Sequence, residues 1–264
     1  MPRAKRRLGQ HFLADPRILA RIADALEAGP ADRVLEIGPG LGGLTEALLA
    51  RAGQVTAIEK DRDLIAPLRE RFPGARLVEG DALDLDWHDL VEAPFLVAGN
   101  IPYNITSPLL DKALLPPRPA RIVFLVQKEV ADRVTAQAGT PEYGALSIGI
   151  QVTARAERLF TVPAGAFHPR PKVDSAVLRL TPLSDPPIAD EERGSFRALV
   201  VGLFGFRRKQ MLRALRELTG WGATRVNEVL ESVAIAETAR PEVVRPPDFV
   251  RLHRALVDGG WPAR

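Results

Sequence analysis

The tetrapeptide Asn100-Ile101-Pro102-Tyr103 combines residue types that suit the binding of a flat base carrying an exocyclic amine. The asparagine supplies an amide, the proline supplies a carbonyl on a rigid backbone, and the tyrosine supplies an aromatic face. The tetrapeptide closely follows an apolar run, Phe95–Ala98, which is typical of a buried strand. Open α/β folds bind ligands at the carboxyl ends of their strands, so we expect a ligand site here.

A glycine-rich loop earlier in the chain has the spacing of an adenosine-binding loop. Gly38, Gly40 and Gly43 follow Arg33–Ile37, a run that predicts a short buried strand. Glu59 ends the next predicted strand, at the spacing at which dinucleotide-binding folds place an acid on a ribose hydroxyl. The loop therefore predicts a cofactor that contains adenosine.

Two acids help to choose between NAD and S-adenosylmethionine, since the glycine spacing fits both. Glu36 lies two residues before Gly38, where an anion would repel a pyrophosphate but attract a sulfonium and an ammonium group. Asp81 follows the third predicted strand and suits an adenine amine, and a solvated turn is the less favoured explanation of an aspartate there. We interpret these acids as favouring S-adenosylmethionine.

The surrounding pattern predicts a β-loop-α-β unit that opens a doubly wound sheet. A helix is expected to begin at Asp15-Pro16, with Ile18, Ile22 and Leu26 on one face. A second helix is expected at Leu44–Arg51. Strands are predicted at Arg33–Ile37, Val55–Glu59, Arg76–Val78, Phe95–Ala98, Arg121–Val126, Gly149–Ala154 and Val173–Leu180.

The C-terminal third has a different, helical pattern. Residues 181–192, with three prolines and no periodicity, predict a linker. Beyond it, apolar residues recur at helical spacing: Phe196, Leu199, Val200 and Leu203, then Met211, Leu212 and Leu215. We therefore predict two domains, an α/β domain over residues 1–182 and a helical domain over residues 183–264.

Composition narrows the class of protein. The 264 residues are 46% hydrophobic and 26% charged, which is usual for a globular protein, and the longest apolar runs are too short to cross a bilayer. The absence of cysteine excludes disulfides, cysteine-ligated zinc and a thiol nucleophile. The basic N-terminus lacks the apolar stretch of a secretory signal, so we expect a cytoplasmic protein with no membrane partner.

Net charge is only +3, but basic residues cluster at Arg3–Arg7 and at Arg207-Arg208-Lys209. Each cluster suits contacts with phosphates, and each is equally typical of a solvated surface.

Taken in order, the glycine loop, Glu59, Asp81 and the Asn-Ile-Pro-Tyr motif resemble the ribosomal RNA adenine dimethyltransferases. The resemblance spans the chain and is greatest to the bacterial branch that modifies small-subunit (16S) rRNA. It includes the segments LGQHFLADP, LEIGPGLGGLT, QKEVADR, FHPRPKVDSAV and FGFRRKQ. It implies an S-adenosylmethionine-dependent methyltransferase with a Rossmann-like doubly wound sheet and a small all-helical C-terminal domain.

The resemblance also implies roles for particular residues. It places the cofactor pocket on His11, Leu13, Gly38, Glu59, Asp81 and Asn100, with His11 where the family commonly has asparagine. It implies that the Asn100 side-chain oxygen and the Pro102 carbonyl accept the hydrogens of the target amine. Tyr103 and Phe167 would hold the base between them, although Phe167 is also typical of an ordinary buried aromatic. We assign no metal ligand.

The implied reaction is transfer of two methyl groups to each of two adjacent adenines, in a hairpin loop near the 3′ end of small-subunit rRNA, during ribosome biogenesis. Arg207, Arg208, Lys209 and the basic N-terminal arm are the candidate phosphate contacts, and the protein is expected to act as a monomer on the small subunit or its precursor.

Three alternatives are open on the sequence. A large-subunit rRNA methylase shares the Asn-Ile-Pro-Tyr motif, whereas the FGFRRKQ segment and the sizeable C-terminal region favour the small-subunit enzyme. An NAD-dependent oxidoreductase would explain the glycine loop alone. A noncatalytic nucleic-acid-binding relative would leave the intact motif without a purpose.

Overall fold

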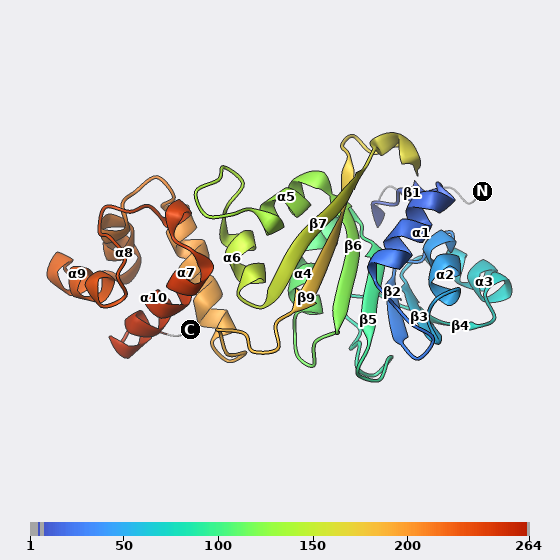
Figure 1. The fold of residues 1–264 in the computed structure, drawn as a ribbon, viewed down its shortest axis with the longest axis horizontal. Coiled ribbons are helices and arrows are strands. Elements are labelled where there is room, and N and C mark those ends of the chain that lie inside the picture. Colours follow the sequence, from blue (N-terminus) through green and yellow to red (C-terminus); the bar gives the residue numbers. More distant parts are fainter. Residues whose placement is uncertain (1–4, 6–7, 263–264) are drawn as a thin grey trace. The chain divides into compact units, whose positions relative to one another are not determined.

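The computed structural model describes residue 5 and residues 8–262, and the chain forms two compact units (Figure 1). The first unit comprises Met1–Ala131 and Ala156–Pro182, and the second comprises Asp132–Arg155 and Leu183–Arg264. Across the described residues, no helix combines the length and the apolar character that crossing a membrane requires. Arg3, Arg6 and Arg7 of the basic N-terminal arm lie outside the described residues.

The first unit is built on a seven-stranded sheet of order β4-β3-β2-β5-β6-β9-β7. The strands are β2 (Arg33–Ile37), β3 (Gln54–Glu59), β4 (Ala75–Glu79), β5 (Leu96–Asn100), β6 (Arg121–Gln127), β7 (Ala154–Val162) and β9 (Ser175–Pro182). The five neighbouring strands β4, β3, β2, β5 and β6 are parallel, and β9 runs antiparallel to β6. The chain order reverses between β2 and β5, and this reversal is where a doubly wound sheet opens a crevice for a ligand.

Among the described residues, the helices that lie wholly in this unit are α1 (Pro16–Ala25), α2 (Gly43–Leu49), α3 (Arg62–Arg71) and α4 (Thr106–Ala113). Figure 1 shows α1, α2 and α3 grouped beside the β2–β4 half of the sheet. Helix α1 begins as predicted, because the Asp15 side chain accepts a 2.9 Å hydrogen bond from the Arg17 amide and Pro16 occupies the first turn. Its apolar face, including Leu19 and Ile22, packs into a core cluster with Val34 and Leu96.

A second, two-stranded sheet joins distant parts of the sequence. Strand β1 (Phe12–Leu13) pairs antiparallel with β8 (Phe167–His168), so that Phe12 lies opposite His168 and Leu13 lies opposite Phe167. Short 3₁₀ turns, η2 (Tyr103–Ile105) and η3 (Ala164–Ala166), precede α4 and β8. The N-terminal segment is thereby held next to the loop that follows β8.

The second unit is mainly helical, as predicted. Its helices are α6 (Ala145–Gln151), α7 (Arg193–Gly205), α8 (Met211–Thr219), α9 (Ala223–Ser232) and α10 (Pro246–Asp258), with the turn η4 (Pro241–Val243). Helix α5 (Lys128–Thr135) spans the boundary between the units. The predicted apolar faces of α7 and α8, with Phe196, Leu203, Met211 and Leu215, are buried in one cluster.

Two expectations about this region differ from the structure. Gly149–Ala154 was expected as a strand, but α6 ends at Gln151 and β7 begins at Ala154. Ile148 and Val152 pack four residues apart into the helical core, and this packing overrides the β-branched composition. Residues 132–155 were assigned to the first domain, yet they belong to the second unit, because Tyr143 and Ile148 pack in that same core.

Candidate active site

A cavity lies at the carboxyl ends of β2, β3, β4 and β5, at the reversal of strand order. Its walls come from the N-terminal segment of residues 8–13, the glycine loop, the ends of β3 and β4, and residues 100–105. Of the nine residues predicted for the site, eight line this cavity: His11, Leu13, Gly38, Glu59, Asp81, Asn100, Pro102 and Tyr103. The ninth, Phe167, does not.

The glycine loop allows the backbone to form the floor of the cavity. Gly38 and Gly40 have φ of 69° and 59°, a left-handed conformation that other residues rarely adopt. A Cβ atom on Gly40 would lie 3.1 Å from the Phe12 ring, and one on Gly43 would lie 2.8 Å from Leu19. Glycine thus allows the turn itself and the close approach of Phe12 and of helix α1 to the loop.

Glu59 is held by backbone amides at the end of β3. One carboxylate oxygen accepts a hydrogen bond from the Gly40 amide at 3.1 Å, and the other accepts one from the Asp61 amide at 2.7 Å. Burial raises the pKa of Glu59, and these two donors oppose that shift. Each carboxylate oxygen keeps acceptor capacity, which suits a ribose diol.

Glu36 precedes the glycine loop by two residues but does not line the cavity. Its side chain is fully buried, and its Oε2 accepts a 2.7 Å hydrogen bond from the Thr45 hydroxyl at the start of α2. Burial raises the pKa of Glu36 to about 8, so this carboxyl is mostly protonated at pH 7. The expectation that Glu36 presents a negative charge to the cofactor is therefore not supported.

Asp81 combines the two interpretations that the sequence left open. Its carboxylate closes a turn by accepting from the Leu83 amide at 2.9 Å, forms an ion pair with Lys60, and also lines the cavity. Burial alone would raise the pKa of Asp81, but the Lys60 ammonium outweighs it and the pKa lies below its usual range. Asp81 is thus an ionised acceptor at the cavity wall.

Asn100 is oriented by the N-terminal segment. Its Nδ2 donates a 2.9 Å hydrogen bond to the backbone carbonyl of His11. Because a carbonyl can only accept, this contact fixes which end of the amide faces His11. The opposite atom, Oδ1, has no hydrogen-bond partner among the described residues and belongs to a side chain that lines the cavity.

The Pro102 carbonyl is already occupied by its own turn. It accepts hydrogen bonds from the Ile105 amide at 3.1 Å and from the Thr106 hydroxyl at 3.3 Å. These two donors use both of its lone pairs. The preceding carbonyl, that of Ile101, has no such donor among the described residues. The structure thus weakens the expectation that Pro102 supplies an acceptor for an amine.

Tyr103 presents a fixed aromatic ring. Its hydroxyl forms a 2.7 Å hydrogen bond with Ser175 Oγ, and the His11 ring stacks on it with centroids 5.7 Å apart. His11 Nδ1 donates a 2.7 Å hydrogen bond to the Pro169 carbonyl, so that nitrogen carries the proton. One face of Tyr103 is covered by His11, and the ring is held in place at its hydroxyl end.

Phe167 has a packing position in this structure. Its side chain is 5% exposed and belongs to the apolar cluster that also contains Leu19 and Val177. Its backbone pairs with Leu13, next to the cavity wall. The second stacking face that we expected from Phe167 stays a prediction.

A larger groove of about 1450 Å³ adjoins the cavity and shares its residues 9–13 and Tyr103. Its far wall is the loop of residues 168–173. Arg51 and Arg71, which also line the groove, are paired with Asp24 and Glu46. Arg170 and Lys172 are exposed on that loop, and neither forms a hydrogen bond or an ion pair with any described residue. They are thus free cations beside Tyr103.

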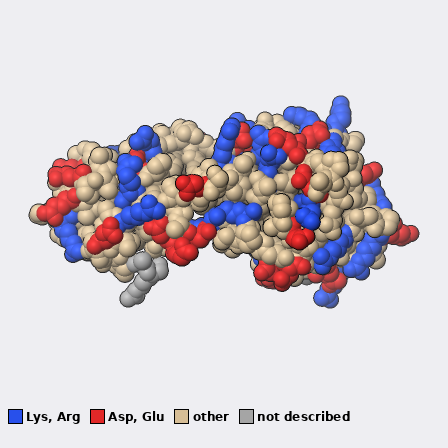
Figure 2. Space-filling view, turned by 60° about the horizontal axis from the view of Figure 1, so that its bottom comes forward, with Lys and Arg blue, Asp and Glu red and all other residues tan. Residues whose placement is uncertain are grey.

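The three basic residues chosen from the sequence are not equivalent. Arg207 pairs with Glu242 at 2.8 Å and donates to the Pro141 carbonyl, and Lys209 pairs with Glu217 at 2.5 Å. Arg208 is exposed without a partner among the described residues. Figure 2 shows basic and acidic side chains interleaved over the face it draws, so that no single sign dominates there.

The sheet order, the glycine loop and the acid at the end of β3 define a Rossmann-like methyltransferase. The sequence matches the ribosomal RNA adenine dimethylase family over residues 1–252, and the chain belongs to that family. It is accordingly an rRNA adenine dimethyltransferase that depends on S-adenosylmethionine. This confirms the class of enzyme and the cofactor expected from the sequence, and disfavours an oxidoreductase.

Curated relatives agree along nearly the whole chain. A protein of Geobacter metallireducens, named ribosomal RNA small subunit methyltransferase A, is 41% identical over 97% of this chain and 96% of its own length. A protein of the same name from Aromatoleum aromaticum is 45% identical over 81% of this chain and 82% of its own length.

Solved structures confirm the fold. A dimethyladenosine transferase from Plasmodium falciparum superposes with a TM-score of 0.84 at 26% identity, covering 95% of this chain and 99% of that one. The 23S rRNA methyltransferase ErmE superposes with a TM-score of 0.73 at 32% identity, covering 93% of this chain and 99% of that one.

Several residues around the cavity were not singled out by sequence reasoning. Ser175 fixes Tyr103, while Gln10 and Asp61 connect the N-terminal segment to α3. Lys5 was expected, as part of the basic N-terminal arm, to contact phosphates, but in the structure it pairs with Asp61 and Asp63. Gln10 and Ser175 both lie in segments that carried the family resemblance, LGQHFLADP and FHPRPKVDSAV. Asp61 lies two residues beyond Glu59, and its signal was the helix start that it caps.

Proposed function

We propose that this enzyme methylates the exocyclic amines of two adjacent adenines in a hairpin loop near the 3′ end of small-subunit rRNA. The observation that carries the proposal is Asn100, whose Oδ1 is unpartnered among the described residues, in the cavity that also contains Glu59 and Asp81. The choice of the small subunit is supported by the relatives named ribosomal RNA small subunit methyltransferase A. The enzyme would act in the cytoplasm as a monomer, with the helical second unit contributing to RNA recognition.

The cavity residues fit S-adenosylmethionine, which supplies a methyl group on a sulfonium. Glu59 would accept from the ribose hydroxyls, and Asp81 from the adenine amine. The left-handed backbone at Gly38 and Gly40 leaves room for close contact along the floor. His11 and Leu13 would cover the cofactor from the N-terminal side.

Asn100 would act on the nitrogen that receives the methyl group. The lone pair of an adenine amine is delocalised into the ring, and acceptors that hold its hydrogens localise that lone pair on nitrogen. Asn100 Oδ1 is the first acceptor. The Ile101 carbonyl is better placed than the Pro102 carbonyl to be the second, because the Pro102 lone pairs are used within the turn. The neutral amine can attack and lose its proton afterwards, so this arrangement needs no strong base.

Tyr103 would hold the base flat on the ring face that His11 leaves open. Stacking of a base on an aromatic side chain contributes about 1–3 kcal/mol. Orientation of the amine in line with the methyl group contributes further, since positioning alone can supply about 7–11 kcal/mol. Both effects depend on a rigid platform, which Ser175 provides through the Tyr103 hydroxyl.

The RNA strand would continue from the cavity into the groove. A target adenine must be unpaired or extruded to reach Tyr103, so its flanking phosphates would lie near the mouth of the cavity. Arg170 and Lys172, free of acidic partners among the described residues, are suited to these phosphates. Arg208 is the remaining free cation of the basic cluster in the second unit, again among the described residues.

The decisive experiment offers the enzyme purified small and large ribosomal subunits that lack the modification, with methyl-labelled cofactor. We expect label in two adjacent adenines of the small-subunit rRNA, released as dimethyladenosine after digestion. Label confined to the large subunit would favour the activity named for the 23S rRNA methyltransferase. Absence of label in both would overturn the proposal, provided that the protein binds the cofactor.

A further inference from the structure

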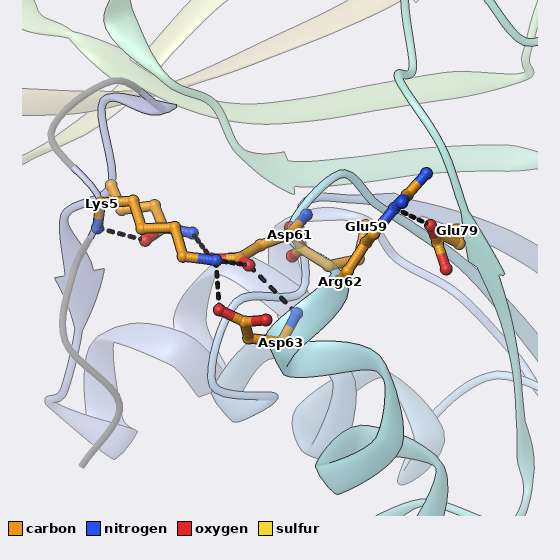
Figure 3. Close-up of polar contacts among 7 residues, drawn as sticks. Lys5, Glu59, Asp61, Arg62, Asp63 and Glu79 are labelled. Carbon is orange, nitrogen blue, oxygen red and sulfur yellow. Dashed lines mark hydrogen bonds and ion pairs between the residues drawn. The ribbon is translucent and has the colours of Figure 1, made fainter.

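The N-terminal segment that covers the cofactor cavity is fastened to the body of the first unit by a cluster of polar contacts (Figure 3). Residues 8–13 line the cavity, and Gln10 lies in the middle of them. Gln10 Nε2 donates a 2.9 Å hydrogen bond to Asp61, and its Oε1 accepts one from the Lys5 amide at 2.8 Å. The Lys5 ammonium reaches Asp61 and also Asp63, the latter at 2.5 Å. We call Lys5, Gln10 and Asp61 the clasp.

Asp61 is the centre of the clasp and lies beside the acid that would bind ribose. Its amide donates to Glu59 Oε1 at 2.7 Å, and its carboxylate accepts from the Asp63 amide at the start of α3. The side chain is 3% exposed. A connected series of contacts thus runs from the Gly40 amide through Glu59 to Asp61, and from Asp61 to the N-terminal segment.

The charges of the clasp are matched. Burial alone would raise the pKa of Asp61, but the hydrogen bonds from Lys5 and Gln10 outweigh burial and its pKa lies below the ordinary value. Hydrogen bonds to Asp61 and Asp63 raise the pKa of Lys5. Both groups are therefore ionised across the physiological range, and their attraction weakens as salt is added.

We propose that Asp61 is a positioning residue for the cofactor: through Lys5 and Gln10 it keeps residues 8–13 closed over the adenosine end of the cavity and slows release of the bound nucleoside. The inference rests on the cofactor placement given under the proposed function. It assigns to Asp61 a task distinct from that of Glu59, because Asp61 would act on the segment that covers the ligand and would not contact the ligand.

The test measures binding of S-adenosylhomocysteine to the full chain by calorimetry and by stopped-flow displacement. Asp61→Asn removes the charge and keeps one oxygen to cap α3, but its NH2 group replaces the oxygen that accepts from Gln10, so the variant breaks both contacts of Asp61 with the clasp. We expect its Kd to rise about tenfold, mainly through faster release, and that of Lys5→Met to rise several-fold. The double variant should lose less affinity than the two single losses combined, since both changes break the Lys5–Asp61 contact and only Lys5→Met also removes the Lys5–Asp63 contact. KM for S-adenosylmethionine should rise while kcat is retained.

Arg62→Gln is the matched control. Arg62 adjoins Asp61 but pairs with Glu79 at 2.5 Å, and Figure 3 shows it pointing away from Lys5. The Kd of Arg62→Gln for S-adenosylhomocysteine should equal that of the wild type. Salt gives a second readout: between about 50 and about 500 mM KCl the wild-type affinity should fall, and the affinity of Asp61→Asn should change less.

Hydrogen exchange separates the possible outcomes. Faster exchange in residues 8–13 of both clasp variants, together with weaker binding, supports the proposal. Faster exchange with unchanged Kd overturns it, because the segment would then be fastened without holding the ligand. Unchanged exchange with an unchanged Kd also overturns it. If the wild type itself fails to bind S-adenosylhomocysteine, the cofactor placement fails as well, whereas equal binding by wild type and variants defeats the clasp alone.

Discussion

The side chain of Asn100 donates a 2.9 Å hydrogen bond to the backbone carbonyl of His11, which lies 89 positions earlier in the chain. The contact uses the His11 backbone and not its imidazole. It therefore tolerates histidine where the family commonly has asparagine, because any residue supplies the same carbonyl. The orientation of the proposed catalytic amide thus depends on where the N-terminal segment lies.

Replacement of Asn100 should remove nearly all methyl transfer. Asn100→Ala removes the oxygen that would localise the amine lone pair, and loss of one preorganised polar group at a reacting centre typically costs about 10²–10³-fold in kcat. Asn100→Asp should be similarly inactive, since a carboxylate would face the His11 carbonyl. Single-turnover methylation of small subunits measures the loss, and calorimetry should show weakened but measurable cofactor binding. Asn227→Ala, in the second unit, is the control; wild-type turnover in Asn100→Ala would refute the role.

Two variants of Tyr103 should distinguish the contribution of its ring face from that of its hydroxyl group. Tyr103→Phe loses only the hydrogen bond to Ser175, so we expect a decrease in kcat/KM of less than about tenfold. Tyr103→Ala loses the stacking surface, worth about 1–3 kcal/mol, which corresponds to about 5- to 150-fold in affinity for the RNA. Steady-state kinetics on small subunits tests this order. Equal effects of the two variants would show that the ring face is not used.

Glu36 predicts how stability depends on pH. Its pKa is raised by burial from 4.5 to about 8 in the folded protein, so between these values the unfolded chain has released a proton that the folded chain keeps. The contribution of Glu36 to the free energy of unfolding is therefore lost as pH rises through that window, by on the order of 4 kcal/mol. Glu36→Gln should remove this decline. Urea unfolding at about pH 5.5 and about pH 8 gives the free energy of unfolding at each pH. An equal change in that free energy for the wild type and for Glu36→Gln would contradict the buried-acid assignment.

Free cations should contribute more to RNA binding than paired ones. Each phosphate that a protein no longer neutralises lowers the slope of log affinity against log salt by about 0.7–0.9, so Arg170→Gln, Lys172→Gln and Arg208→Gln should each flatten it by about that amount. Arg207→Gln and Lys209→Gln are the matched controls, because both cations already have acidic partners. Filter binding to the rRNA hairpin across about 50–300 mM salt makes the comparison. A flatter slope for the two controls than for the three test variants would favour Arg207 and Lys209 as the phosphate contacts, as expected from the sequence.

Local sequence patterns were sufficient to predict most helices and strands of the first unit. The Asp15-Pro16 helix start, the glycine loop and the strands flanking it depend on capping, backbone conformation and apolar runs within a few residues. Gly149–Ala154 was predicted wrongly because α6 is held by tertiary contacts. Ser147 accepts from the Gly144 amide, and Ile148 packs in a core formed by later helices.

Contacts between distant residues account for the rest of the site. The residues that line the cavity were identified through motifs, but the partners that set their state were not. Asn100 is oriented by the His11 carbonyl 89 positions away, Glu36 is neutralised by burial, and Arg207 is paired with a glutamate 35 positions away. None of these follows from residue type or spacing, because each depends on how elements pack in three dimensions.

The ribbon formed by β1 and β8 lines both the cavity proposed for the cofactor and the groove proposed for RNA. Phe12 and Leu13 belong to the cofactor wall, and His168, opposite Phe12, belongs to the groove proposed for RNA. If cofactor binding orders this ribbon so that RNA binds more tightly by some factor, RNA must tighten cofactor binding by the same factor, since coupling free energies are reciprocal. A dimethylation consumes two cofactor molecules per base. Under such coupling, each replacement of spent cofactor would change the affinity for the half-modified RNA.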